Sequence, residues 1–371
     1  MNIFKATEDF EQWLAKRLPI VRQDVALKHA LMAQNPFSFF RATFYRWLQH
    51  WHDNCEKPAK APIVLGVGDL HIENFGTWRD TEGRLIWGVN DLDEAFPAPY
   101  TLDLVRLATS AYLAIDSDHL KMTRREAAEA IEEGYRDSIA DGGQAFILAE
   151  HHQRLRLLAT SRLRDPVSFW DKLQKCPTYT TKLPDEARQL IEESLPLPKR
   201  PYQLRRRIAG LGSLGHPRIL ALSSSQGALI AREAKGIRTS AWVWYKNSNS
   251  DVVYGLKLVN TAIRVQDPTV RFRGHWVVRR LAPDCSRIEL ASLMIPKDES
   301  QLLYDMGWEA ANMHFGTPRA IPKIKRDLAA RKGRWLHKSA KAMLKITMED
   351  WEEWRRHWKT KARTLPSTRA D

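Results

Sequence analysis

The stretch GVGDLHIENFG, residues 66–76, decides the fold of this chain, and NDLDEAFP follows it at residues 90–97. Each stretch comes at the end of a short apolar run, APIVL and RLIW, of the kind typical of buried strands. Asp69 and Asn74 are five residues apart, and Asp91 stands at the end of the second run. Carboxylate and amide oxygens are ligands that Mg²⁺ prefers. The sequence therefore predicts a metal site, which suits a phosphoryl transferase, a metal-dependent hydrolase or a phosphate-binding protein without catalysis.

The chemistry of phosphoryl transfer from ATP gives each of these residues a role. In that reaction an Asp accepts the proton of the acceptor hydroxyl, while an Asn and a second Asp hold Mg²⁺ against the phosphates. We expect Asp69 to be the catalytic base and Asn74 and Asp91 to be metal ligands. The letters DLH also match the first element of metallophosphoesterases, but the further G-D-x-x-D and G-N-H elements of a two-metal site are absent from the sequence. The phosphoesterase interpretation therefore ranks below the transferase.

Three neighbouring residues carry less specific signals. Asp93 and Glu94 are equally compatible with metal binding and with a turn or an ion pair, and we assign Asp93 to the metal site. His71 can orient the loop through hydrogen bonds or touch a phosphate. It is included among the candidate catalytic residues, although a structural role is the stronger expectation.

A glycine-rich turn supplies a candidate cover for nucleotide phosphates. RIAGLGSLGHPRILAL places Gly210, Gly212 and Gly215 in G-x-G-x-x-G spacing, with Ser213 inside, between two strand-like runs. Backbone N–H groups of such a turn approach phosphate oxygens closely, and a strand on each side is the kinase arrangement. A helix after the turn would indicate a dinucleotide-binding fold, and HPRILALSSS is a poor helix. A plain glycine-rich hairpin turn is the alternative.

The next strand, GALIAREAKG, offers Arg232 and Lys235 as a cation for the phosphates. These two residues point to opposite faces of a strand, so at most one of them faces the cleft without a bulge. We assign Arg232.

The order of the motifs predicts a circular permutation. In an ordinary kinase the glycine turn precedes the catalytic loop, but here it follows Asp69 by about 140 residues. The first 55 residues are predicted to be helical and cannot supply a strand-rich lobe. We expect an α+β, protein-kinase-like, two-lobed fold, circularly permuted, with extra N- and C-terminal helices. The expected parts are a helical extension (1–60), a part with the catalytic and metal-binding loops (61–200), a β-rich part with the glycine loop (201–285), a hinge and returning helix (286–318) and a basic helical tail (319–371).

The first block of motifs resembles a known family. GDLHIENFG…VNDLDEAFPAPYTLDLVRLATS is similar to the pattern GDxHxxNFG…NDFDE…DxxRLxxS of an uncharacterised bacterial family that is grouped with the protein-kinase-like and aminoglycoside-phosphotransferase superfamily. LMAQNPFSFFR resembles its upstream MxxSPFxFxR element, and IAGLGSLG, REA and WVVRRL follow in the family's order, so the resemblance spans roughly residues 28–316.

The resemblance implies a kinase-like fold with Asp69 as base, Asn74 and Asp91 on Mg²⁺, and Asp103 bracing the catalytic loop from a helix. The resemblance also implies Arg232 as the cation that contacts the phosphates, since it stands where the family usually has Lys. The chain departs from the family here: Arg keeps the charge but not the compact geometry of an ammonium. Val67 also stands where many relatives have the catalytic-loop His.

Charge and composition bound the remaining expectations. Residues 319–371 contain 16 Lys and Arg against 6 Asp and Glu, so this tail carries +10 of the net charge of +14. Trp351, Trp354 and Trp358 share one helical face, which favours docking on the body; contact with an acidic partner or with nucleic acid is the alternative. The three cysteines form no CxxC pair, and no apolar run reaches about 18 residues. We expect a cytoplasmic protein without a membrane span.

Together these patterns predict a phosphotransferase that uses ATP and Mg²⁺ and acts on an unidentified hydroxyl acceptor, either a small molecule or a protein. A nucleotide-binding regulator with little or no catalysis is the second interpretation, and the departure at Arg232 supports it. A metal-dependent phosphoesterase is the third.

Overall fold

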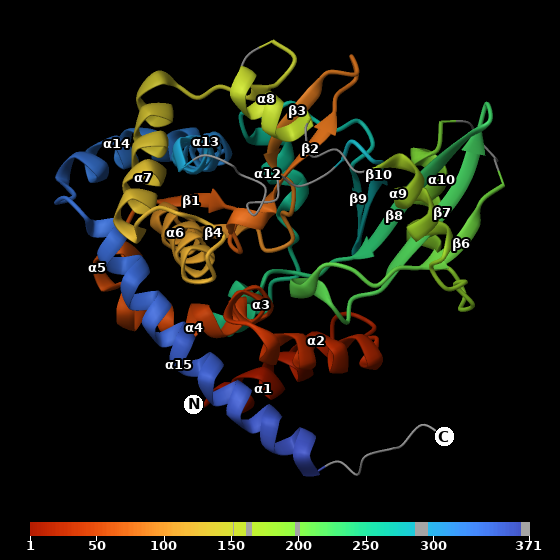
Figure 1. The fold of residues 1–371 in the computed structure, drawn as a ribbon, viewed down its shortest axis with the longest axis horizontal. Coiled ribbons are helices and arrows are strands. Elements are labelled where there is room, and N and C mark those ends of the chain that lie inside the picture. Colours follow the sequence, from red (N-terminus) through yellow and green to blue (C-terminus); the bar gives the residue numbers. More distant parts are fainter. Residues whose placement is uncertain (151, 161–164, 197–200, 286–295, 365–371) are drawn as a thin grey trace.

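The protein has a mixed α+β fold in which a largely helical body, with two small sheets, lies beside a five-stranded antiparallel sheet (Figure 1). A computed structural model describes residues 1–150, 152–160, 165–196, 201–285 and 296–364. The PLPKRP stretch (196–201), whose composition is typical of a linker, and the hinge expected from residue 286 lie largely outside these residues.

The N-terminal residues form helices, as the sequence predicts, and lie below the body in Figure 1. Asn35 caps one of them, because its side chain accepts the Ser38 N–H at 2.7 Å. Pro36 is the first residue of this helix, where a backbone N–H would have no partner within the helix, so its absence does not destabilise the helix. The helices are α1 (Ile3–Ala15), α2 (Arg22–Gln34), α3 (Pro36–Ala42), α4 (Phe44–Asn54) and α5 (Glu56–Ala59).

Short strands support the loops that carry the acidic residues. The sequence predicts β1 (Ile63–Gly66) and β3 (Leu85–Val89), and both are present. It missed β4 (Phe96–Pro99), which pairs with β1, because two prolines in four residues argue against a strand. It also missed β2 (Phe75–Arg79), which pairs with β3, and the two-residue β5 (Phe146–Ile147).

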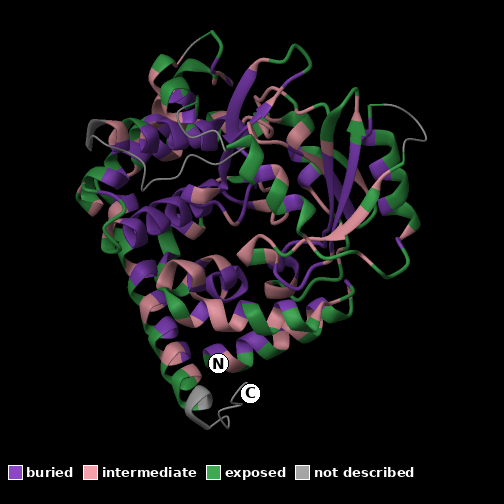
Figure 2. Ribbon diagram, turned by 45° about the vertical axis from the view of Figure 1, so that its right-hand side comes forward, coloured by how far each residue is buried: buried purple, intermediate pink, exposed green. Residues whose placement is uncertain are grey.

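Three helices make the centre of the body: α6 (Tyr100–Asp116), α7 (Arg124–Asp141) and α13 (Pro296–His314). Figure 2 shows buried residues concentrated here and along the middle strands of the sheet. Gly134 of α7 and Gly307 of α13 let these two helices approach closely, since a Cβ at either position would overlap a backbone carbonyl of the other helix. The helix α13 thus packs beside α7 and comes close to the Asp69 loop, although the two are far apart in the sequence.

The sheet contains β6 (Gln203–Arg206), β7 (Arg218–Ser225), β8 (Ala228–Gly236), β9 (Arg271–Arg273) and β10 (Trp276–Leu281), in the order β6-β7-β8-β10-β9. All of its pairs are antiparallel. Four of these strands are predicted by the sequence, and β9 was missed. Leu190 and Ile191 of α10 (Asp185–Ser194) cover one face, where they cluster with Ile219 and Val278. The connections contain α8 (Gln153–Thr160), α9 (Pro166–Gln174), α11 (Ala241–Tyr245) and α12 (Gly255–Thr261).

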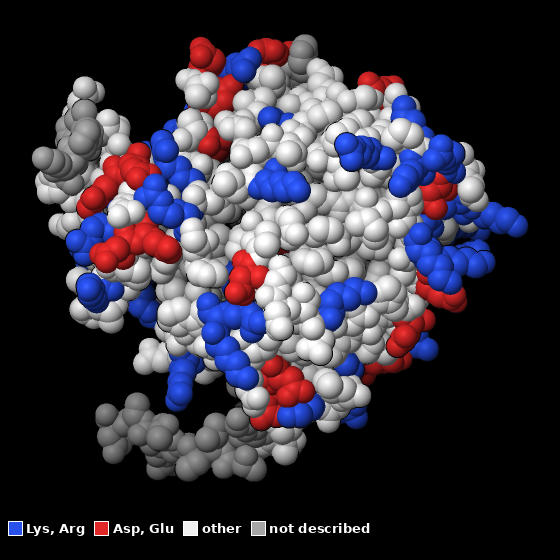
Figure 3. All heavy atoms as spheres, turned by 180° about the vertical axis from the view of Figure 1, so that it is seen from behind, with Lys and Arg blue, Asp and Glu red and all other residues white. Residues whose placement is uncertain are grey.

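The C-terminal helices α14 (Ile321–Ala330) and α15 (Trp335–Thr364) return along the body. Trp351 and Trp354 of α15 are buried against α1, α2 and α3, in a cluster with Ile3, Met32 and Phe39. The tail therefore docks through its tryptophans, as expected. On the face seen in Figure 3, the described Lys and Arg side chains stand in separate groups, with Asp and Glu among them, around a largely uncharged centre.

No helix in the described part of the chain is long and apolar enough to span a membrane.

We predict that Trp354→Ala lowers the free energy of unfolding by about 3 kcal/mol, because truncating a buried aromatic side chain leaves a cavity. Trp354 is 5% exposed, stacks on Phe4 with ring centroids 5.4 Å apart and donates its indole N–H to the His29 carbonyl at 3.2 Å. Denaturant unfolding measures the loss. Trp358→Ala, one turn further on and partly exposed, is the matched control. Equal, small losses for both variants would contradict the docking.

Candidate functional site

The loop that carries Asp69 is held from behind by Asp103 of α6. The Asp103 carboxylate accepts the N–H of Val67 at 2.7 Å and the N–H of Gly68 at 2.8 Å. Its Oδ2 lies 2.9 Å from Nε2 of His314, the last residue of α13, and Nδ1 of that ring lies 2.9 Å from the Tyr135 hydroxyl. Gly68 has a φ of +87°, which favours glycine. Asp103 thus fixes the backbone at Val67 and Gly68 and links it to the end of α13.

Asp69 points away from this brace and meets a buried arginine. Nε of Arg106 lies 2.6 Å from Asp69 Oδ1, and Arg106 has no exposed surface. The guanidinium carbon of Arg106 stands 3.9 Å from the ring centre of Phe40 and 4.8 Å from that of Phe44. Burial raises the pKa of Asp69 to about 7, although Arg106 opposes the shift. A carboxylate that titrates near neutral pH has the property required of a general base.

Asn74 and His71 complete the loop. The Asn74 amide donates to the Asp69 carbonyl at 2.5 Å, which leaves its side-chain oxygen available as a ligand. His71 is 3% exposed, and its Nδ1 accepts the Glu73 N–H at 3.2 Å. This geometry fits the orienting role for His71 better than contact with a phosphate.

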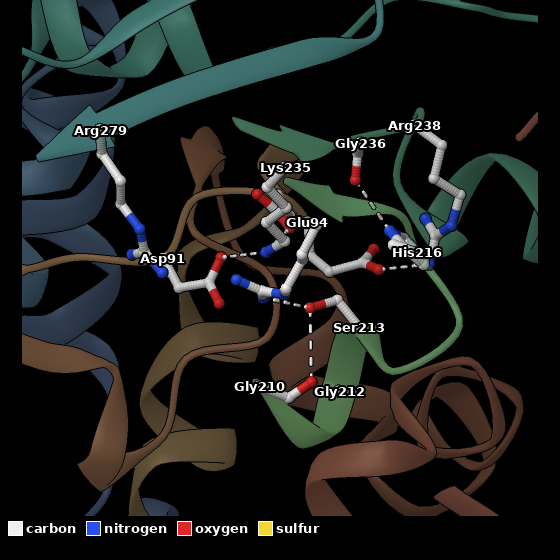
Figure 4. A network of polar contacts seen from close by, with 12 residues as sticks. Asp91, Glu94, Gly210, Gly212, Ser213, His216, Lys235, Gly236, Arg238 and Arg279 are labelled. Carbon is white, nitrogen blue, oxygen red and sulfur yellow. Dashed lines mark hydrogen bonds and ion pairs between the residues drawn. The ribbon is translucent and has the colours of Figure 1, made fainter. Parts of the chain in front are cut away.

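Lys235 of β8 is the cation that faces this loop. Its ammonium lies 3.5 Å from Asp91 Oδ1 (Figure 4). It also forms an ion pair with Asp93. Arg232 lies on the opposite face of the strand, where its guanidinium donates to the carbonyl of Ser194 at 2.8 Å. The structure therefore does not bring Arg232 to the candidate site. The expectation for Arg232 is corrected to Lys235, because residues three apart on a strand alternate in direction.

The glycine turn joins β6 to β7 and lies over Asp69. Gly210 and Gly215 have φ angles of +74° and +100°. A Cβ added to Gly212 would stand 3.0 Å from the Arg41 carbonyl and 3.8 Å from Asp69 Oδ2. The Ser213 hydroxyl accepts a hydrogen bond from Nη2 of Arg218 at 2.7 Å, so the turn is tied to the sheet (Figure 4).

These elements enclose a small space that we call the Asp69 cavity, of about 50 Å³. Its walls include Asp69, Asn74, Asp91, Asp93, Gly212, Ser213 and Lys235. Seven candidate residues from parts of the chain more than 100 positions apart therefore meet at one place.

A second space, the arginine cavity, adjoins it and has a volume of about 330 Å³. Asn74, Asp91 and Gly210 line it together with Arg207, Arg218 and Arg279. These three arginines surround Glu233, which is fully buried, and they hold its pKa well below the usual range although burial alone would raise it. Three cations against one carboxylate leave positive charge immediately around Glu233, while Glu73, Asp91 and Asp267 line other parts of the cavity. The volume lies at the lower end of the range for small-molecule pockets, roughly 300–1,000 Å³.

Sequence reasoning missed these arginines, and it also missed Lys28 and Arg41 from the N-terminal helices, which line the Asp69 cavity. The three arginines stand in three different segments, and only the antiparallel register of the sheet brings them together. The PFSFFR element of the family resemblance contains Arg41, so one signal did point to α3.

The donor set fits Mg²⁺ bound jointly by protein and phosphate. Asn74, Asp91 and Asp93 all contribute oxygen atoms to the Asp69 cavity, and the Asp91 side chain is 44% exposed. No group of three or more His, Cys, Asp and Glu side chains within the described ranges forms a metal cage. Mg²⁺ in nucleotide sites is held by one or two carboxylates plus substrate phosphates, so such a cage is not required.

Glu94, which the sequence left open between two roles, takes the structural one. Its carboxylate accepts the Arg238 guanidinium at 2.7 Å, the Ser240 hydroxyl at 2.8 Å and the Ala241 N–H at 2.6 Å. With these partners Glu94 anchors the segment that follows β8.

Comparison with known proteins adds one match. Residues 19–169 match a family described as an uncharacterized protein conserved in bacteria (DUF2252). The matched part contains Asp69, Asn74, Asp91 and Asp103 and ends before the glycine turn. No curated protein and no solved structure matches the chain. The match supports the bacterial family named from the sequence motifs and assigns no activity.

We predict that Asp103→Asn lowers the free energy of unfolding by about 3 kcal/mol, because the amide of Asn cannot accept all three hydrogen bonds of the carboxylate. Hydrogen exchange at the amides of Val67 and Gly68 becomes faster in this variant. Asp350→Asn is the matched control: Asp350 is also a buried carboxylate, paired with Arg46 at 2.8 Å, but far from the loop. Equal exchange rates at Val67 and Gly68 in both variants would show that Asp103 does not hold the loop.

Proposed function

We propose that this protein is an ATP- and Mg²⁺-dependent phosphotransferase with a circularly permuted kinase-like fold, acting on a hydroxyl acceptor. One observation carries the proposal. The Asp69 loop, braced by Asp103, faces the β8 cation Lys235 and the glycine turn across a single cavity.

The parts correspond in kind to those of a kinase, which supports the proposal. A glycine turn joins the first two strands of the antiparallel sheet, and the third strand carries a lysine that faces the catalytic loop. Opposite this lysine are Asp69, Asn74 five residues after it, and Asp91 on a neighbouring loop. Their order along the chain is reversed relative to an ordinary kinase, which is why we propose permutation.

The proposed reaction moves one phosphoryl group. The acceptor oxygen forms a bond to the γ-phosphorus as its proton passes to an Asp69 carboxylate oxygen, and the bond from that phosphorus to the β–γ bridging oxygen breaks, so ADP leaves. Lys235, Arg218 and Arg279 stand where they can neutralise phosphate charge. Bound Mg²⁺ would neutralise further phosphate charge, with Asn74, Asp91 and Asp93 as its protein ligands.

A nucleotide-binding regulator is the second candidate, and the position of Gly212 over Asp69 favours it, because the turn covers the base. The departure at Arg232 gives it no further support, since that side chain lies outside the cavity. No observation favours the phosphoesterase.

We predict that Lys235→Met weakens binding of Mg-ATP at least tenfold, whereas Arg232→Met leaves it unchanged. One charge-assisted contact to a phosphate contributes about 1.5–3 kcal/mol, which corresponds to such a factor. Titration calorimetry measures both dissociation constants. The two variants remove cations from opposite faces of one strand and are therefore matched.

The same preparation separates the candidate functions. Wild-type protein that does not bind Mg-ATP would refute both the transferase and the regulator. Binding without transfer of the γ-phosphate to any acceptor or to water would favour the regulator. Cleavage of a simple phosphate ester in the absence of ATP would favour the phosphoesterase.

We predict a pH dependence set by Asp69. A base must be deprotonated, and burial raises the pKa of Asp69 to about 7. We therefore expect kcat/KM to rise about tenfold per pH unit below pH 7 and to level off above it. Steady-state assays of γ-phosphate transfer between pH 5.5 and 8.5 measure the profile, with circular dichroism as the control for folding. Asp69→Asn should lose transfer at every pH. A flat wild-type profile would exclude Asp69 as the base.

A further inference from the structure

Lys28 of α2 is a buried cation that none of the roles above explains. Its exposure is 5%, and it lines the Asp69 cavity. It also lines a third cavity, of about 200 Å³, between α1, α2 and the glycine turn, whose walls include Leu14, Val25 and Leu214. An ammonium removed from water is costly unless it is paired. A buried lysine on the wall shared by two cavities therefore requires an explanation.

Lys28 differs from the other cations of the Asp69 cavity in its hydrogen-bonding and ion-pair partners. Among the described Lys and Arg side chains that line this cavity, Lys28 alone has no ion pair with a carboxylate. The other three form ion pairs as follows: Arg41 with Glu73, Lys235 with Asp91 and Asp93, and Arg238 with Glu94. The ammonium of Lys28 instead donates a long hydrogen bond, 3.4 Å, to the carbonyl of Gly212.

Burial lowers the pKa of Lys28 to about 8, and Arg238 adds to the decrease, while Glu11, Glu94 and Asp69 oppose it. Lys28 is therefore largely protonated at neutral pH. A cation with one weak neutral partner destabilises the fold relative to an apolar side chain of the same size. Destabilising groups of this kind are found at functional sites.

The Gly212 carbonyl is the group that an incoming ligand would displace. Gly212 stands between Lys28 and Asp69, since its carbonyl meets Lys28 and a Cβ on it would be 3.8 Å from Asp69 Oδ2. Gly210 and Gly215 flank it with φ angles of +74° and +100°, which gives the turn a glycine at each end. A change of backbone conformation at these two glycines would move the Gly212 carbonyl away and leave the Lys28 ammonium able to bind another oxygen.

We propose that Lys28 binds a phosphate-type oxyanion beside Asp69, in the place that the Gly212 carbonyl takes in this structure. The N-terminal helices would then provide an anion site of their own, distinct from the arginine cavity. The oxyanion is either the phosphoryl group in transfer or a phosphate carried by the acceptor. Binding at this site does not depend on ATP turnover, so it can be tested even if the proposed transfer fails.

The test uses inorganic phosphate and the full-length chain. Titration calorimetry should show phosphate binding to the wild type that is at least tenfold weaker in Lys28→Met, which keeps the volume of the side chain and removes its charge. Lys28→Gln, which keeps a hydrogen-bond donor for Gly212, should be weakened equally. Lys16→Met removes the same charge from the exposed residue that follows α1, and this variant should bind phosphate like the wild type.

Stability distinguishes a binding residue from a structural one. Lys28→Met should melt at the same temperature as the wild type or higher, because an unpaired buried charge is removed. No phosphate binding to the wild type at millimolar concentrations would overturn the proposal. Equal phosphate affinity of the wild type and Lys28→Met would overturn it as well, and so would a lower melting temperature accompanied by unchanged binding.

The nucleotide identifies the source of the oxyanion. If Lys28 holds the phosphoryl group in transfer, Lys28→Met weakens binding of Mg-ATP and leaves Mg-ADP unchanged. If Lys28 holds a phosphate of the acceptor, Lys28→Met binds both nucleotides with the affinity of the wild type but still binds inorganic phosphate more weakly. Either pattern, together with the loss of inorganic phosphate, supports the site.

Discussion

The candidate site depends on the carboxylate of Asp103. The backbone N–H groups of Val67 and Gly68 are buried, and without an acceptor each would cost more than the hydrogen bond itself contributes. One carboxylate satisfies both and also holds His314 at 2.9 Å. It therefore fixes the direction in which Asp69 leaves the strand and attaches the end of α13 to the same point. A helix that is distant in sequence and the acidic loop share one anchor.

Opposite charges held close together make the rest of the site. Lys235 forms ion pairs with Asp91 and Asp93, and three arginines surround Glu233. Removing one member of a buried pair leaves the other uncompensated, at a cost of several kcal/mol. A polyanion that draws Lys235 away therefore needs a cation to take its place at the aspartates. Under the proposed function, nucleotide and Mg²⁺ would satisfy both halves together, so their binding should be mutually dependent.

The sequence predicts the local features and the meeting of the Asp69 loop with the glycine turn, but it does not predict which cations and helices complete the site. The N-terminal helices, β1, β3 and four strands of the sheet follow from apolar periodicity, and the Asp69 loop follows from residue spacing. The strand β4, with prolines in its short span, carries no such signal. Alternation along a strand shows that Arg232 and Lys235 face apart but not which one faces the cleft. Arg232 was preferred because it stands where the resembling family usually has Lys. Lys28 lies on a helix of ordinary pattern, and only tertiary packing brings it to the cavity.

The separation of the two halves of the site along the chain adds little to the entropy cost of bringing them together. About 140 residues separate Asp69 from Gly210. The entropy cost of closing a loop grows with the logarithm of its length, so each doubling adds only about 0.6 kcal/mol. Contacts made by the N-terminal helices offset such a cost: the Val21 N–H donates to the Gly215 carbonyl at 2.9 Å, and Asp24 pairs with Arg206 of β6. The helix α2 thus holds the glycine turn against the loop it faces. This tie comes from outside the sheet, and it makes the N-terminal helices part of the site.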